Sequence, residues 1–308
     1  MGEETIDLAA DNAVEAIVRD ELARETRALK AVVPVLRHLL ASDAHALVSD
    51  AILARVRGMI TDLAGQLLAA EAGYDPAIRS GAVNPAAVDQ LAQTLMAQEA
   101  LLRFCHALAA EYLIAERLQQ RHAIDPVLSP LLQELIASDD PGIAGLAMST
   151  LAAQSRFIQS QRRMELALGE LPAELFHGLA ARVDNSAGLA RLQADYDEAR
   201  GRLGLLARLV ASMRRGMVAA LGLDHAGLAL FASALDASTR CGRDDAVLAC
   251  HEGQSMRLAL LLRVSGLSDP AIGRQLVLVD PAGQLPLAHG QLAADRAAAL
   301  LASHDSLQ

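Results

Sequence analysis

The residues with the greatest capacity for metal or redox chemistry are two adjacent cysteine–histidine pairs. Cys105 is followed by His106, and Cys250 by His251 and Glu252. Thiolate, imidazole and carboxylate groups are common zinc ligands, but neighbours on a helix project about 100° apart, so neither pair converges on one ion. We therefore predict no metal site and no cofactor. Both pairs are interpreted as helix histidines beside buried thiols.

His251 also begins the run HEGQSMR, which faintly resembles the phosphoacceptor box of sensor kinases. Phosphotransfer would need an exposed imidazole on a helical bundle. The proline that the family carries downstream and an ATP-binding region are both missing, and none of the nine histidines lies in a His-x-x-Lys-Gly motif. A structural role for His251 is favoured, and phosphotransfer is the alternative.

An arginine stripe is the main candidate for partner binding. On a helix expected over residues 187–221, Arg200, Arg208, Arg214 and Arg215 share one face and leucine, valine and methionine occupy the other, where only Arg202 is out of place. Such a face would bind an acidic protein partner, with anionic lipid or RNA as other possible occupants. RNA ranks last because few aromatic residues are near for base stacking. The competing interpretation is a solvated face paired with acidic neighbours.

Catalytic and nucleotide-binding motifs are missing from the chain. There is no GxSxG, GxGxxG, GxxxxGK[ST] or HExxH pattern. This favours a non-enzymatic protein, with an enzyme of unrecognised family as an alternative.

The elements that must position these residues are best defined at residues 129–154, SPLLQELIASDDPGIAGLAMSTLAAQ. The spacing predicts two amphipathic helices, with Met148 among the apolar residues of the second. Asp140 should cap that helix and Pro141 should occupy its first position. A hairpin this short needs stacked neighbours to bury both faces. The stretch resembles a HEAT-type repeat, and the chain resembles uncharacterised bacterial HEAT-like helical-repeat proteins; the resemblance implies stacked helical hairpins and leaves function open.

An internal duplication is suggested by a shift of 96 positions, which lays residues 35–56 over 131–152. Each copy precedes an expected long helix, at residues 85–122 and 187–221. We therefore predict three consecutive helical units, 1–123, 124–222 and 223–308, the second a duplicate of the first. Residues 275–287, QLVLVDPAGQLPL, predict at most one small β-hairpin.

Composition supports an all-α fold. Apolar residues make up 53% of the 308 residues but aromatic residues only 2%, so the core must be built from leucine and alanine, which favours helices. The net charge of −10 argues against nucleic-acid binding. Three cysteines without CxxC spacing indicate a reduced, cytoplasmic chain. The apolar window 217–235 contains Asp224 and His225, so we predict a helix capped at Asp224 and no membrane span.

Together, these features predict an all-helical, non-catalytic interaction or scaffolding module that presents the arginine face to an acidic protein. The alternative is a helical-bundle phosphotransfer protein or an unrecognised enzyme. The sequence sets neither the partner nor the oligomeric state.

Overall fold

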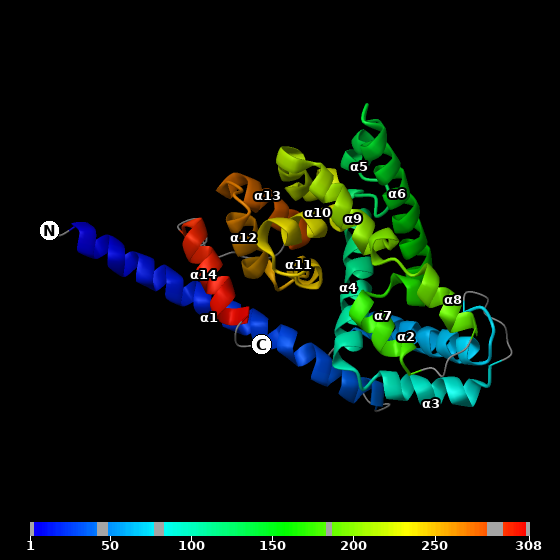
Figure 1. Cartoon of the computed structure of the whole chain (residues 1–308). Coiled ribbons are helices and arrows are strands. Elements are labelled where there is room, and N and C mark those ends of the chain that lie inside the picture. Colours follow the sequence, from blue (N-terminus) through cyan, green and yellow to red (C-terminus); the bar gives the residue numbers. More distant parts are fainter. Residues whose placement is uncertain (1–2, 42–48, 77–82, 183–186, 282–291, 306–308) are drawn as a thin grey trace. The chain divides into compact units, whose positions relative to one another are not determined.

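The computed structural model describes residues 3–41, 49–76, 83–182, 187–281 and 292–305, with side chains omitted at 3–12, 38–41, 188–189 and 304–305. Throughout these ranges the regular structure is helical and no strand occurs (Figure 1). The all-α prediction is therefore confirmed. Leucine and alanine dominate the buried side chains, as the shortage of aromatic residues requires.

The chain packs into two compact units, each built from separate segments. Unit 1 contains Met1–Val32, Ile114–Leu131 and Met213–Gln308, and unit 2 contains Val33–Leu113 and Leu132–Ser212. Three of the boundaries fall within α1 (Glu3–Ala41), α4 (Glu99–His122) and α5 (Pro130–Ile136), and the fourth follows Ser212. The three consecutive units expected from the sequence stay a prediction.

Unit 2 is built from helices of the middle of the chain. Besides the end of α1, the first part of α4 and most of α5 (Pro130–Ile136), unit 2 contains α2 (Asp50–Glu71), α3 (Pro85–Leu95), α6 (Pro141–Arg162), η1 (Leu168–Glu170), α7 (Ala173–Ala180), α8 (Ala187–Asp195), η2 (Glu198–Arg200) and α9 (Arg202–Ser212). α6 lies along α9, and α2 packs against α3 and α8 (Figure 1). Between Leu101 and Leu118, α4 is buried on several sides, as its apolar sequence predicts.

Unit 1 is a second set of helices with its own core. It contains η3 (Arg214–Leu221), α10 (Leu223–Thr239), α11 (Arg243–Ala249), α12 (Ser255–Val264), α13 (Asp269–Val279) and α14 (Ala294–Asp305). α10 packs against η3 and α11, and α12 packs against α13 and α14 (Figure 1). Gly227 has φ 69°, and a Cβ there would lie 3.1 Å from the Ser129 Cβ. Glycine thus permits both the kink in α10 and this close approach.

A buried carboxylate joins α1 to the start of α12 within unit 1. Glu25 is only 3% exposed and accepts hydrogen bonds from the backbone N–H groups of Met256 at 3.0 Å and Arg257 at 2.8 Å. The Arg257 guanidinium donates back to the Thr26 hydroxyl at 3.0 Å. Glu25 therefore caps the amino terminus of a helix more than two hundred residues further along the chain.

The hairpin at residues 129–154 is partly as predicted. It comprises α5 (Pro130–Ile136) and α6, and Asp140 caps α6 by accepting from Gly142 N at 2.8 Å, with Pro141 at the first helical position. The prediction for Met148 is wrong, since its side chain is 52% exposed. HEAT-like stacking stays a prediction.

Neither of the two expected long helices is continuous. Residues 85–122 form α3 and α4, separated by a turn at 96–98, although the Asn84 cap is correct. Residues 187–221 form α8, η2, α9 and η3. Backbone conformation interrupts this second expected helix at two positions. Gly201 is extended and Arg214 has φ 49°, and neither conformation continues an α-helix.

Three further expectations concern smaller elements. The first half of the expected β-hairpin is wrong, because residues 275–279 are the end of α13, and residues 282–287 lie outside the described part. Asp224 sits in the first turn of α10 and does not cap it; the capping position is Gly222. The duplication stays a prediction, because the turn of the earlier hairpin at 42–48 also lies outside the described residues.

Candidate functional site

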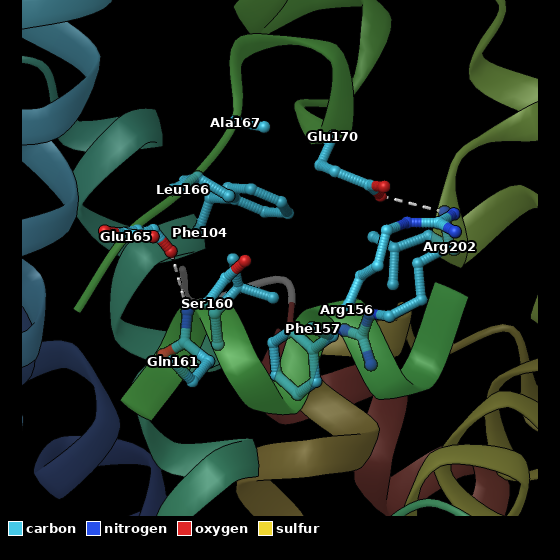
Figure 2. A pocket seen from close by; sticks show the side chains of 12 residues that line it. Phe104, Arg156, Phe157, Ser160, Gln161, Glu165, Leu166, Ala167, Glu170 and Arg202 are labelled. Carbon is cyan, nitrogen blue, oxygen red and sulfur yellow. Dashed lines mark hydrogen bonds between the residues drawn. The ribbon is translucent and has the colours of Figure 1, made fainter. Parts of the chain in front are cut away.

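The candidate site is an open pocket within unit 2 with a cavity volume of about 130 Å³. Figure 2 shows its lining side chains, which come from α4, α6, α9 and the segment between α6 and α7. The lining residues are Phe104, Leu108, Arg156, Phe157, Ser160, Gln161, Glu165, Leu166, Ala167, Glu170, Arg202 and Leu203.

The floor of the pocket follows from helical spacing. Phe104 and Leu108 are four residues apart on α4, so they share one face, and both are buried. Phe157 on α6 and Leu166 after it are also buried. These side chains give the pocket an apolar base, with Leu203 of α9 half-buried at its side.

A buried ion pair supports one wall. The two terminal nitrogens of Arg202 donate to the two carboxylate oxygens of Glu111, each at 2.8 Å, and the pair is almost fully buried. Arg202 Nη1 also donates to Gln154 Oε1 at 3.0 Å, and the guanidinium stacks 3.6 Å from the Phe157 ring centroid. The bidentate geometry, the added amide and the aromatic face together compensate for removing both charges from water.

The segment that forms the rim is tied to α2. Gln66 donates to Leu166 O at 2.8 Å and accepts from Leu168 N at 3.0 Å. A Cβ at Gly58 of α2 would lie 2.6 Å from the Met164 Cβ, so only glycine allows α2 to approach this closely. The rim is therefore held by hydrogen bonds and by close packing, and it does not depend on a ligand for its shape.

The polar groups at the rim differ in how they are paired. Glu165 accepts from Arg163 Nε at 2.6 Å, and Glu170 accepts from the backbone N–H of Arg202 at 2.9 Å. Arg156 is exposed, and within the described residues it makes no hydrogen bond or ion pair. The rim thus carries one cation that is available to a ligand.

The arginines singled out in the sequence do not line this pocket. Arg200 lies in η2 and Arg208 in α9, both in unit 2, while Arg214 and Arg215 lie in η3 of unit 1. All four are exposed, as expected for a solvent-facing stripe. The prediction that the four arginines share one face of a continuous helix is wrong, because the helix is interrupted at Gly201 and again at Met213 and Arg214.

His251 differs from its prediction, whereas Cys105 and Cys250 agree with theirs. His251 is half-buried in the turn after α11 and is not on a helix; its Nδ1 lies 2.6 Å from the Glu252 carbonyl oxygen. Cys105 and Cys250 are buried, in agreement with their interpretation as buried thiols. Burial raises the pKa of Cys241 to about 11, so this thiol stays protonated at neutral pH.

The described residues contain neither a cluster of metal ligands nor a single helix suited to crossing a membrane. Across the described ranges, no group of three or more His, Cys, Asp or Glu residues is arranged to hold a metal ion. In the same ranges no single helix is both long and apolar enough to cross a membrane. The pair η3 and α10 would pass by length and composition together, but the two are bent by 116°.

Sequence reasoning missed the pocket, although one signal pointed to it. Arg202 is the single arginine on the apolar side of its helix, and it proved to be the buried partner of Glu111. Glu111 lies within the apolar part of α4, and it is also buried. A charged residue on each of two apolar faces was therefore the available clue to a buried pair.

Comparison with protein-family models, with curated proteins and with solved structures finds no match for this chain.

Proposed function

We propose that the protein is a non-catalytic binding module and that the pocket of unit 2 accepts a small molecule with an apolar body. The observation that carries this proposal is the combination of an apolar floor with a rim that is already fixed. Phe104, Leu108 and Phe157 form the floor, and Gln66 and the Arg202–Glu111 pair fix the surroundings. A preformed site loses little conformational entropy when a ligand binds.

This proposal is tested by blocking the pocket with a larger side chain. Ala167 is exposed and lines the pocket, so Ala167→Phe should fill the space without disturbing buried residues. The matched control is Ala152→Phe, which adds the same ring at an exposed position of α6 that does not line the pocket. The probe is 1-decanol, which has an apolar chain and no charge.

We expect 1-decanol to bind the wild type and Ala152→Phe, and to bind Ala167→Phe at least tenfold more weakly. Isothermal titration calorimetry gives the affinities. Thermal unfolding gives an independent measure, since a ligand at 100 times its Kd stabilises a protein by about 2.7 kcal/mol. Equal binding to all three proteins, or binding to none, would contradict the proposal.

A second candidate function is docking of an acidic protein partner on the exposed arginines. The observation in its favour is that Arg200, Arg214 and Arg215 make no ion pair with any described residue, whereas a solvated face paired with acidic neighbours was the competing interpretation. In unit 1, Arg214 and Arg215 are adjacent, and Val218 beside them is 63% exposed. Such a patch suits a partner carrying carboxylates around an apolar contact.

The second candidate predicts salt-sensitive binding of poly-L-glutamate. The double variant Arg214→Gln/Arg215→Gln should lose most of the binding seen with wild type at low ionic strength. Arg274→Gln is the control, because Arg274 is an exposed arginine in the same unit. Binding should also weaken between about 0.05 and 0.5 M salt, since exposed charges are screened. Unchanged binding by the double variant would rule out this surface.

A further inference from the structure

We infer that the pocket of unit 2 selects a ligand with one negative charge at the end of an apolar chain, that is, an amphipathic monocarboxylate. This inference rests on the proposed function and adds the chemistry of the head group. It follows from the pairing of the other charged groups at the pocket, which leaves Arg156 without a partner among the described residues, from the position of one hydroxyl, and from the apolar floor.

The pairing of the lining charges leaves one cation available. Arg202 is neutralised by Glu111, and Glu165 is paired with Arg163. Glu170 is held by the N–H of Arg202, at the amino terminus of α9, where the helix dipole favours a negative charge. Four charged side chains line the pocket: Arg156, Glu165, Glu170 and Arg202. Of these, only Arg156 makes no hydrogen bond or ion pair with a described residue.

A hydroxyl lies one helical turn from this arginine. Ser160 follows Arg156 by four residues on α6, so both occupy the same face, and both line the pocket. A guanidinium and a hydroxyl can both donate to the two oxygens of a carboxylate. Figure 2 shows these two side chains on α6, with Glu170 on the opposite side of the pocket.

The number of cations sets the charge of the ligand. One guanidinium compensates one negative charge, whereas a phosphate monoester carries nearly two at neutral pH and would retain an uncompensated charge beside the apolar floor. The floor itself takes a hydrocarbon chain, because the buried atoms of Phe104, Leu108, Phe157 and Leu166 offer no charged group. A carboxylate with an unbranched chain satisfies both requirements.

The test compares three probes of equal chain length: decanoate, 1-decanol and decylamine. Affinities are measured by isothermal titration calorimetry on the full-length chain at pH 7.5 and low salt. We expect decanoate to bind about tenfold more tightly than 1-decanol, because a charge-assisted hydrogen bond at an exposed site falls at the low end of its range. Decylamine should bind more weakly than 1-decanol. Each CH₂ removed from the carboxylate should cost about fourfold in affinity.

Variants of the two donors locate the head group. Arg156→Gln should reduce decanoate binding to the level of 1-decanol and leave 1-decanol binding unchanged. Ser160→Ala should weaken decanoate a few-fold. Arg162→Gln is the matched control, since Arg162 is an exposed arginine on the same helix that does not line the pocket. Circular dichroism checks that each variant keeps its helical content, which is expected because Arg156 and Arg162 are both exposed.

The outcomes separate this inference from the proposed function. If none of the three probes binds, the pocket is not a ligand site and both proposals fail. If decanoate and 1-decanol bind equally and Arg156→Gln changes neither, the ligand site stands and the carboxylate preference is wrong. If decylamine binds most tightly, the preference is reversed and Glu170 is the head-group partner.

Discussion

Replacing Arg202 by methionine is expected to lower the free energy of unfolding by about 3 to 5 kcal/mol, the cost of removing one member of a buried ion pair. The side chains of Arg202 and Glu111 are only 3% and 2% exposed, so the Glu111 carboxylate would lose its guanidinium partner in a position with little access to water. The Phe157 ring would also lose its stacked cation. Urea unfolding followed by helical circular dichroism measures the change.

A second substitution distinguishes pairing from packing. In the double variant Arg202→Met/Glu111→Leu no charge remains unpaired, so most of the lost stability should return. Arg208→Met is the control, because Arg208 is an exposed arginine on the same helix, and it should change the stability by less than about 0.5 kcal/mol. If the free energy of unfolding of Arg202→Met lies within about 1 kcal/mol of the wild-type value, the ion pair is less buried than in the structure.

Glu25 is expected to make the stability fall as the pH rises from about 4.5 to 7. Burial raises the pKa of Glu25 from 4.5 to about 7, and nearby Glu21 acts in the same direction, while the N–H groups of Arg257 and Met256 and the charge of Arg257 oppose it. Because the pKa is higher in the folded state, protonation favours folding. The contribution is therefore complete below pH 4.5 and is lost as the pH passes 7. A rise of this size corresponds to about 3 kcal/mol.

The Glu25→Gln variant isolates this effect from other titrating groups. The difference in the free energy of unfolding, wild type minus variant, should fall by about 3 kcal/mol between pH 4.5 and pH 8, whatever the intrinsic effect of the amide. Carbon NMR of the Glu25 carboxyl should show a midpoint near pH 7. A difference that rises with pH would mean that the two backbone hydrogen bonds to the carboxylate outweigh its burial.

The Arg202 and Glu25 predictions concern different units, and both involve partners far apart in the sequence. Arg202 and Glu111 are separated by 91 positions, and Glu25 and Arg257 by 232. Each pair stabilises contacts between helices that local sequence does not connect. Their loss should therefore affect unfolding of the unit as a whole and not only the fraying of one helix.

The sequence by itself determined the helical class and several helix ends. A core of leucine and alanine with few aromatic residues allows close helix packing, and this property is local to each helix. The caps at Asn84 and Asp140 could be predicted because a capping side chain bonds to backbone groups two or three residues away. The exposure of Arg200, Arg208, Arg214 and Arg215 was predicted correctly, although the single continuous helix from which it was predicted is wrong.

Tertiary structure alone decided the breaks in the expected long helices and the position of the pocket. Apolar periodicity continues through Gly201 and Arg214, but their backbone conformations end the helices there, and periodicity carries no information on such dihedral angles. Residues 275–279 have a strand-like composition, yet they extend α13, where Gln275 accepts a hydrogen bond from Leu223 N at 2.8 Å. The pocket depends on side chains from α4, α6 and α9 that meet only after folding. Burial of the Arg202 charge is tolerated because Glu111 pairs with it. The two residues are 91 positions apart in the sequence, and only the tertiary packing of unit 2 brings them together.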